Sequence, residues 1–451
     1  MSSLSRPACL IFLCIVVSYA SLGALYSSRV PLWNAPDEPS HFNYVRYLAE
    51  TRQLPVLQVG DYDQSYLERL KAERFPPGLS VDSLRYESHQ PPLYYALAAL
   101  VYAPFASHVV EARALALRLF SVTLGALALW MAFGIARILF PKDASLSLGV
   151  VALIAFIPMR LAIYSSVNND VLAELVVSGA LLTLMSRWAQ PRPRTHLALL
   201  GMIVGLAMLT KVIAYALVLV VPFGLFLSEV ARLRQLPGAS RTTLTRSAKT
   251  AGLASLAVGA IAALISGWWF VRNALVYGWP DIFGLARHDL VVAGQPLTGA
   301  LTAAVAKDFV VVTFHSFWGQ FGWMGVLLDD RIYVALEVLT AFAALGVLLC
   351  LGTWRHRTGR MPPDQIGPLA LLALTAFLVF GFVVQYNLKY VQTQGRYLFP
   401  ALVPIAVYAV IGLREVLAEE HRGLLFALLF GGLCVLDVVS LFGFIVPALS
   451  A

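Results

Sequence analysis

Residues 34–42 (NAPDEPSHF) place two adjacent carboxylates, Asp37 and Glu38, directly behind the first apolar run of the chain, residues 8–26. Carboxylates are among the most costly groups to hold near hydrocarbon, and the flanking prolines predict a rigid turn. One interpretation is that Asp37 caps a helix that begins after it. Capping needs a single acceptor and leaves Glu38 and His41 unexplained, so we expect this turn to carry part of the function.

The composition is typical of a membrane protein. The 451 residues are 59% hydrophobic and 13% charged, and the mean hydropathy of +0.75 lies far outside the soluble globular range. We therefore predict an all-α, polytopic transmembrane protein. The run at residues 8–26 is long enough to span and lacks a clear small-residue cleavage pattern, so we expect a retained helix. The four cysteines lie in apolar runs without ligand spacing, which argues against redox chemistry or metal binding at cysteine.

The net charge of +8 arises mostly from Lys and Arg in short loops between apolar runs. This pattern indicates membrane orientation rather than nucleic-acid binding, and it places the basic loops on the cytoplasmic side. Those loops are residues 137–142, 187–196, 232–249 and 354–360. They predict about 11 membrane helices of roughly 20 residues each, some of them shorter. The expected spans are residues 8–26, 114–139, 145–164, 171–185, 196–209, 212–227, 252–269, 332–353, 369–386, 398–413 and 424–447.

Residues 92–105 are apolar but short for a span, and a crossing there would reverse the placement of the basic loop at 137–142. We expect an interfacial or re-entrant helix on the outer side. Two long external loops remain, at residues 27–90 and 270–331. No internal repeat or linker divides the chain, so residues 1–451 are expected to form a single transmembrane domain.

On this topology the polar residues that are hardest to explain lie at the outer ends of the helices. They are Asp37, Glu38, His41, His89, Arg160, Asn168, Asn169, Asp170, Lys211 and Arg396. Polar residues placed at random would fall on both faces, so this one-sided gathering predicts a site.

Several of these residues have alternative interpretations. His89 could be a solvated residue of a turn, and the sequence at 168–170 could cap the helix that begins at Val171. Lys211 interrupts an otherwise apolar stretch, so its ammonium either meets an anion or extends to the lipid headgroups. Arg396 lies in a turn that opens a membrane helix, where a guanidinium suits the phosphate of a substrate or of an ordinary lipid. Carboxylates and cations on one face suggest chemistry on an anionic, membrane-bound substrate, such as a sugar on a lipid phosphate.

Four motifs together resemble the GT-C superfamily of membrane glycosyltransferases. They are PDEPSHF at 36–42, HQPPLYY at 89–95, LTK at 209–211 and QGRYLFP at 394–400. Within the superfamily the chain is similar to the clan of bacterial protein mannosyltransferases and aminoarabinose transferases, in a branch that shares the Asp-Glu-Pro and Gly-Arg-Tyr motifs. The resemblance covers residues 8–413.

The resemblance implies that Asp37 is the catalytic base and that the donor is a sugar on polyprenyl phosphate. Glu38 is expected to orient Asp37 or its loop. Residues expected to contact the substrates are His41, His89, Arg160, Asp170, Lys211, Arg396 and Tyr397. The soluble C-terminal domain of several relatives has no counterpart here, which leaves open a glycan, lipid or protein acceptor.

The expected reaction transfers the sugar to an acceptor hydroxyl with inversion, at the periplasmic face of the bacterial inner membrane. This chemistry requires no cofactor, although clustered carboxylates are compatible with a divalent cation. Membrane lipids are expected partners and nucleic acid is not. The alternatives are a flippase or transporter of lipid-linked sugars, a polysaccharide polymerase or ligase with a lipid-diphosphate donor, and a non-catalytic scaffold.

Overall fold

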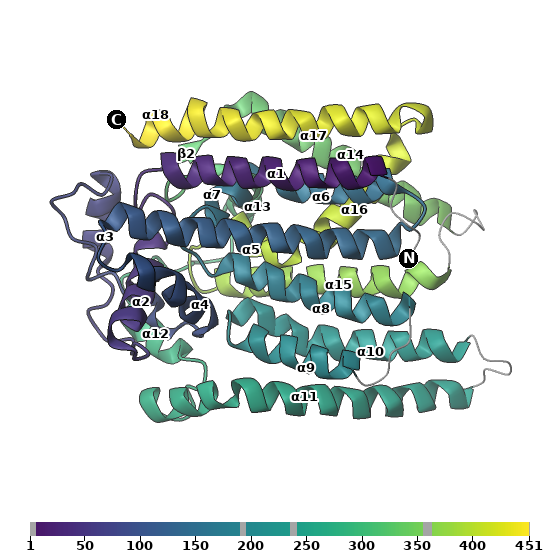
Figure 1. The fold of residues 1–451 in the computed structure, drawn as a ribbon, viewed down its shortest axis with the longest axis horizontal. Coiled ribbons are helices and arrows are strands. Elements are labelled where there is room, and N and C mark those ends of the chain that lie inside the picture. The colour runs from purple at the N-terminus through teal and green to yellow at the C-terminus, as the bar shows by residue number, and fades with distance from the viewer. Residues whose placement is uncertain (1–5, 190–194, 235–240, 355–362, 451) are drawn as a thin grey trace.

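The computed structural model describes residues 6–189, 195–234, 241–354 and 363–450. Figure 1 shows long helices that run side by side, with several short helices gathered at one end of the bundle. Nine helices in the described ranges are long and apolar enough to cross a membrane. The prediction of an all-α polytopic membrane protein is confirmed.

The long helices are each dominated by an apolar run. They are α1 (Arg6–Arg29), α5 (Val110–Leu139), α8 (Asp170–Ala189), α10 (Leu217–Arg234) after the 3₁₀ turn η3 (Val212–Ala216), α11 (Arg241–Tyr277), α14 (Asp330–Trp354), α15 (Pro363–Asn387), α16 (Leu402–Val416) after η4 (Gly395–Ala401), and α17 (Arg422–Val439). Past α17 the chain continues through a π-helical turn η6 (Ser440–Ile445) into α18 (Val446–Leu449), after η5 (Glu419–His421) has opened the same span.

Two of the predicted spans differ from a straight helix of full length. The span at 145–164 is broken into α6 (Ala144–Ala155) and α7 (Pro158–Tyr164), which meet at 59°. The proline at the start of α7 has no N–H for the helix ladder, which explains the break. The span at 196–209 is α9 (Thr195–Met208), an apolar helix of only 14 residues. The nine long helices, the bent pair and α9 together correspond to the eleven predicted crossings.

The first predicted external loop folds into short helices: α2 (Glu38–Thr51), α3 (Gln64–Ala72) and η1 (Tyr86–His89). The apolar segment that follows is α4 (Leu93–Tyr102) with η2 (Ala103–Phe105). In Figure 1, α4 lies with α2, α3 and α12 at one end of the bundle. The stacked rings of Tyr44 and Tyr95, 3.7 Å apart, join α2 to α4. The apolar segment at 92–105 therefore forms a short helix at the end of the bundle, as predicted.

The second predicted loop, residues 270–331, contains more structure than expected. It includes the end of α11, then α12 (Leu285–Val291), the 16-residue helix α13 (Ala303–Trp318), and the two-residue strands β1 (Gln320–Phe321) and β2 (Val326–Leu327). α11 extends to Tyr277 because Arg272 lies over the rings of Trp269 and Tyr277. The helix α11 therefore continues past Arg272, beyond the predicted end of this span at residue 269.

The predicted basic loops follow helices that end away from α2, α3 and α12. In Figure 1 the last turns of α8, α10 and α14 lie at the opposite end of the bundle from these short helices. The basic loop at 354–360 lies almost entirely outside the described residues. The helix ends that adjoin the predicted basic loops and the acidic turn therefore lie at opposite ends of the bundle.

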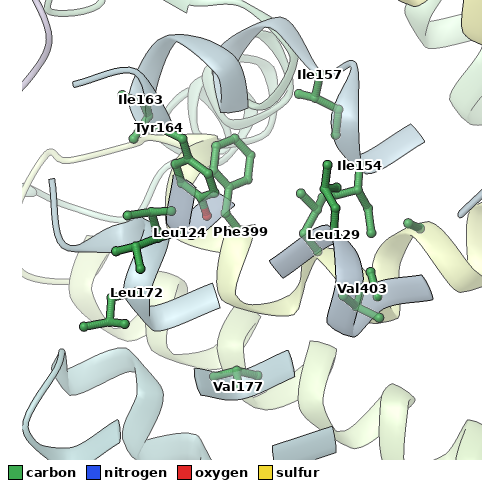
Figure 2. Close-up of a cluster of buried hydrophobic side chains, with 14 of the residues drawn as sticks. Leu124, Leu129, Ile154, Ile157, Ile163, Tyr164, Leu172, Val177, Phe399 and Val403 are labelled. Atoms are coloured by element: carbon green, nitrogen blue, oxygen red, sulfur yellow. The ribbon is translucent and has the colours of Figure 1, made fainter. Parts of the chain in front are cut away.

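A buried apolar cluster joins the elements that carry the candidate site residues. Figure 2 shows Leu124 of α5, Ile163 of α7, Leu172 of α8 and Phe399 of η4 among its members. The ring of Tyr164 meets Phe399 edge to face, with centroids 6.0 Å apart. Packing of this kind fixes the beginning of α8 beside η4, although the two are distant in sequence.

Candidate functional site

Four charged side chains of alternating sign lie side by side, and we name Asp37, Arg396, Asp170 and Lys211 the charge cluster. Nη2 of Arg396 donates to Oδ2 of Asp37, and Nη1 of Arg396 lies 3.7 Å from Oδ2 of Asp170. Nζ of Lys211 donates to Oδ1 of Asp170 at 2.5 Å. The four residues come from the turn before α2, from η4, from the start of α8 and from the turn before η3. The structure thus brings together residues that are up to 359 positions apart.

Asp37 occupies the position before α2 but does not cap that helix with its side chain. Its backbone has φ 66°, in the left-handed region that Asp tolerates better than most residues. One carboxylate oxygen faces Arg396, and the other accepts a hydrogen bond of 2.9 Å from the hydroxyl of Tyr86. Capping as the task of this side chain is therefore wrong. The carboxylate points instead toward the charge cluster.

The ionisation of Asp37 is set by opposing effects. Burial acts to raise the pKa of Asp37, but the charge of Arg396 and the hydrogen bonds from Arg396 and Tyr86 outweigh burial and lower it. The Asp37 side chain keeps 22% of its surface exposed, whereas Arg396 keeps 1%. Asp37 is therefore an ionised carboxylate that solvent or a ligand can reach.

A cavity of about 490 Å³ opens beside this carboxylate. Asp37, Tyr86, Glu87 and Tyr397 contribute to its wall. The remaining lining residues come mainly from α3, from the segment before and within α13, and from the connection between α15 and η4. The charge cluster meets the cavity through Asp37.

Glu38 faces away from the cavity and is fully buried. Its two oxygens accept from Nε and Nη2 of Arg118, each at 2.7 Å. They also accept from the backbone N–H groups of Trp33 at 3.1 Å and Val167 at 3.2 Å. These bonds tie Glu38 to the turn that carries Asp37, and Glu38 offers no oxygen to a ligand in the cavity.

Arg160 does not join the charge cluster. It is fully buried in α7, where Nε and Nη2 each donate to Glu174 at 3.0 Å. Its guanidinium also lies over the rings of Tyr19 and Tyr164, at 5.1 and 4.6 Å. The expectation that Arg160 contacts the donor is corrected by this geometry, because Glu174 neutralises its charge inside the bundle.

The two predicted histidines are buried and neutral. Nδ1 of His41 lies 2.8 Å from the hydroxyl of Tyr95, and burial lowers the pKa of His41 to about 3. Nδ1 of His89 donates to the carbonyl of Tyr86 at 3.0 Å, and its ring lies 4.6 Å from that of His288. Burial and the neighbouring His288 lower the pKa of His89 well below its usual value. Neither histidine adds a positive charge at neutral pH.

Sequence reasoning missed two residues at the cavity wall, Tyr86 and Glu87. Oε2 of Glu87 is buried and has no hydrogen-bond partner within the described part of the chain. Burial and the charge of Asp37 raise the pKa of Glu87 to about 7. Both residues stand directly before the HQPP motif, but they end a polar tract that looks solvated in the sequence. That tract gave no signal of burial.

Clustered carboxylates are a common setting for a divalent cation. In the ranges that the structure describes, no group of three or more His, Cys, Asp or Glu side chains is arranged to hold a metal ion. Metal dependence therefore stays a question for experiment.

The fold is similar to that of two solved structures, an archaeal oligosaccharyltransferase and the bacterial protein ArnT. The oligosaccharyltransferase of Archaeoglobus fulgidus, solved with Zn and sulfate, matches 98% of this chain and 53% of its own, at 16% identity and a TM-score of 0.54. ArnT of Cupriavidus metallidurans, solved with undecaprenyl phosphate, matches 99% of this chain and 74% of its own, at 14% identity and a TM-score of 0.54. At these identities the likeness shows the fold alone, and the chain spans about half the length of the archaeal enzyme.

The chain belongs to the family described as "Predicted membrane protein (DUF2142)", whose model matches residues 80–405. The matched range includes Glu87, Asp170, Lys211 and Arg396 and begins after Asp37. No curated protein sequence matches the chain.

Proposed function

We propose that this protein is a membrane glycosyltransferase that moves a sugar from a polyprenyl-phosphate donor to an acceptor hydroxyl. The observation that carries the proposal is the Asp37 carboxylate. It lines the cavity, and its two oxygens accept hydrogen bonds from Arg396 and Tyr86. The GT-C fold supports the same reaction class, since ArnT with this fold was solved with undecaprenyl phosphate.

The proposed step is one displacement at the anomeric carbon. The acceptor oxygen forms a bond to that carbon as the bond from carbon to the phosphate oxygen breaks, and the electron pair of that bond leaves with the phosphate. The acceptor proton passes to Asp37, which must lie within hydrogen-bond reach of the hydroxyl. A single displacement inverts the configuration at the anomeric carbon.

Lys211 is the cation that we assign to the departing phosphate. Its side chain is 16% exposed, whereas that of Arg396 is 1% exposed. Arg396 then keeps Asp37 ionised and in place, and both cations stabilise the negative charge that grows on the phosphate. Tyr397 completes the wall between Arg396 and the cavity, with the guanidinium 5.1 Å from its ring.

The positions of the basic loops support an orientation for this chemistry. The helices α8, α10 and α14, which lead into loops that the positive-inside rule assigns to the cytoplasm, end at the other end of the bundle from α2 and α3. We therefore propose that the cavity faces the periplasm across the bacterial inner membrane. The acceptor is then an extracytoplasmic molecule.

Transfer by the purified protein in lipid nanodiscs tests this proposal, with radiolabelled sugars on polyprenyl phosphate as donors. We expect Asp37→Asn to lower turnover by about 10² to 10⁴, because the amide cannot accept a proton. Asp82→Asn is the matched control, since that carboxylate is 63% exposed and pairs with Arg46 away from the cavity. Unchanged turnover in Asp37→Asn would remove Asp37 as the base and direct the search to Asp170.

A further inference from the structure

We infer that the cavity beside Asp37 is an acceptor subsite for a neutral or amine-bearing oligosaccharide, and that it excludes anionic acceptors. The inference rests on the proposed function and names its acceptor class. A cavity of about 490 Å³ lies within the usual range for bound small molecules, about 300–1,000 Å³. Three features of the wall identify the class: rings, unpartnered acceptor atoms and charge.

Aromatic side chains form much of the cavity wall. They are Tyr62, Tyr86, Trp323, Tyr386 and Tyr397. The Trp323 ring is held in place because its Nε1 donates to the carbonyl of Trp33 at 2.8 Å and because Phe75 stacks on it at 6.0 Å. Fixed rings with a polar edge suit the flat, apolar C–H faces of pyranose sugars.

Two buried oxygen atoms at the wall have no hydrogen-bond partner in the described ranges. They are Oε1 of Gln320 and Oε2 of Glu87, and Gln320 as a whole is 9% exposed. The amide nitrogen of Gln320 already donates to the carbonyl of Met324 at 2.9 Å, which fixes the orientation of its oxygen. Buried acceptors normally have partners. A ligand that supplies O–H or N–H donors satisfies both atoms.

Further amide and hydroxyl groups at the wall extend this pattern. They belong to Gln64, Gln295, Asn387, Gln392, Thr393 and Gln394. Several of these groups already bond within the protein, such as the Gln394 amide nitrogen, which donates to the oxygen of Gln392 at 3.0 Å. The Gln392 side chain also lines the cavity, and amide groups of this kind can bond sugar hydroxyls. The oxygen of Gln394 accepts from Nε of Arg396 at 2.6 Å, and this bond joins the wall to the charge cluster.

The charges at the wall disfavour an anionic acceptor. Four carboxylates line the cavity, those of Asp37, Glu68, Glu87 and Asp308, against Lys71 and His288. Lys71 pairs with Glu68 at 2.6 Å and Arg396 pairs with Asp37. Asp308 has no ion-pair partner within the described residues, and Glu87, whose pKa is raised to about 7, adds a partial negative charge at neutral pH. Like charges brought together at an interface repel each other, so the wall excludes acceptors rich in phosphate or uronate. It attracts an ammonium group.

Binding measurements on the intact protein in nanodiscs test the inference without a donor. The probes are chitotetraose as a neutral ligand, its de-acetylated form as an amine, oligogalacturonate as an anion, and an uncharged hydrophilic peptide, each followed by saturation-transfer NMR. We expect the neutral and amine probes to bind and the anion to bind at least about tenfold more weakly. Comparable binding of the anion, binding of the peptide alone, or no oligosaccharide binding at millimolar concentration would each overturn the inference.

Variants locate the binding. Gln320→Leu should weaken chitotetraose about tenfold or more, because it removes a buried acceptor, whereas Gln53→Leu on the exposed surface after α2 should leave it unchanged. Asp308→Lys at the exposed edge should raise the affinity for oligogalacturonate. No change in either Gln320→Leu or Asp308→Lys would place the oligosaccharide elsewhere and overturn the assignment.

Failure of this inference is distinguishable from failure of the proposed function. Binding of oligosaccharide without any donor consumption by the wild-type protein would contradict the glycosyltransferase and leave the subsite. Donor consumption that requires an anionic acceptor would contradict the subsite and leave the glycosyltransferase.

Discussion

Asp37 and Glu38 are neighbours in sequence and carboxylates in type, yet the structure gives them opposite surroundings. Glu38 is fully buried, and the fork of Arg118 with two backbone N–H groups occupies its oxygens. Asp37 is 22% exposed, pairs with one nitrogen of Arg396 and lines the cavity. A carboxylate with a complete set of donors holds structure, and a carboxylate with an open side is available for chemistry. Partner geometry, and not residue type, separates the two.

The same contrast separates the two buried arginines. Arg160 meets Glu174 through two nitrogens at 3.0 Å, which closes that pair inside the bundle. Arg396 and Asp170 approach only to 3.7 Å, and both facing atoms lack a hydrogen bond within the described part of the chain. At 3.7 Å this contact is longer than a hydrogen bond, so it leaves the hydrogen-bonding capacity of both facing atoms unused. Arg160 therefore has one carboxylate partner inside the bundle, whereas Arg396 lies between two carboxylates, one of which lines the cavity.

Asp37→Asn provides the largest expected effect on this comparison. The amide keeps the size of the side chain and tolerates the left-handed backbone, and Asp170, 3.7 Å from Arg396, still compensates the charge of that arginine. The variant should therefore fold, insert and bind donor like wild type. We expect transfer to fall by about 10² to 10⁴ because no proton acceptor remains at that position. Steady-state transfer in nanodiscs measures this, with thermal unfolding as the test of fold. A melting temperature well below that of wild type would make Asp37 a structural residue as well.

Glu38→Gln should act on stability instead. Removing one partner of a buried ion pair leaves Arg118 uncompensated and costs about 3–5 kcal/mol. We expect a low yield and a lowered melting temperature for this variant in detergent. Thermal unfolding and size-exclusion chromatography measure the two effects. The double variant Glu38→Gln with Arg118→Met should recover part of the loss, since it removes the stranded cation. A Glu38→Gln protein that melts like wild type but does not transfer would give Glu38 a catalytic role and break the comparison.

Lys211→Ala tests the cation side of the charge cluster. The variant lacks a cation that stabilises the negative charge developing on the phosphate in the transition state. This loss costs a few kcal/mol, or roughly a hundredfold in rate. Arg396→Ala should reduce transfer to a similar extent, and Lys211→Arg should recover little, because a planar fork does not replace a point charge in a confined site. Lys249→Ala, on the basic side of the bundle, is the control. Near-normal transfer by both alanine variants would reduce these cations to anchors.

Glu87 is a cavity carboxylate that has no ion-pair partner within the described residues. Its substitution should produce the smallest effect, a change in how the stability of the protein depends on pH. Burial and the charge of Asp37 raise the pKa of Glu87 from 4.5 to about 7, against the opposing charges of Lys211 and Arg396. Between these values the folded protein holds a proton that the unfolded chain releases. The free energy of unfolding therefore decreases as the pH rises through this window.

Glu87→Gln removes that titration. We expect wild type to lose about 1–3 kcal/mol relative to the variant between about pH 5 and 8. Thermal unfolding across this range measures the difference, with Glu73→Gln at an exposed carboxylate as the control. Parallel pH profiles for wild type and Glu87→Gln would show that Glu87 titrates as a solvated group.

The spans and the acidic turn were predictable because their signals are local. About 20 apolar residues predict a crossing by themselves, and a charged residue near hydrocarbon stands out. α13 was missed because Lys307, Asp308 and His315 interrupt a short apolar stretch that resembles a loop. The partners of Glu38 and Arg160 were not predictable, because Arg118 lies 80 positions from Glu38 and spacing does not reveal which cation faces which acid. Only the packing of α5, α7 and α8 decides that.

The left-handed backbone at Asp37 limits which mutations the protein tolerates. Most side chains pay roughly 1–2 kcal/mol at such a φ, whereas Gly, Asn and Asp adopt it readily. Asn and Gly are each one nucleotide change from an aspartate codon. The genetic steps that disturb the fold least are therefore those that remove the carboxylate, so spontaneous variants at this codon should be well-folded, membrane-inserted and inactive proteins that compete with wild type for donor.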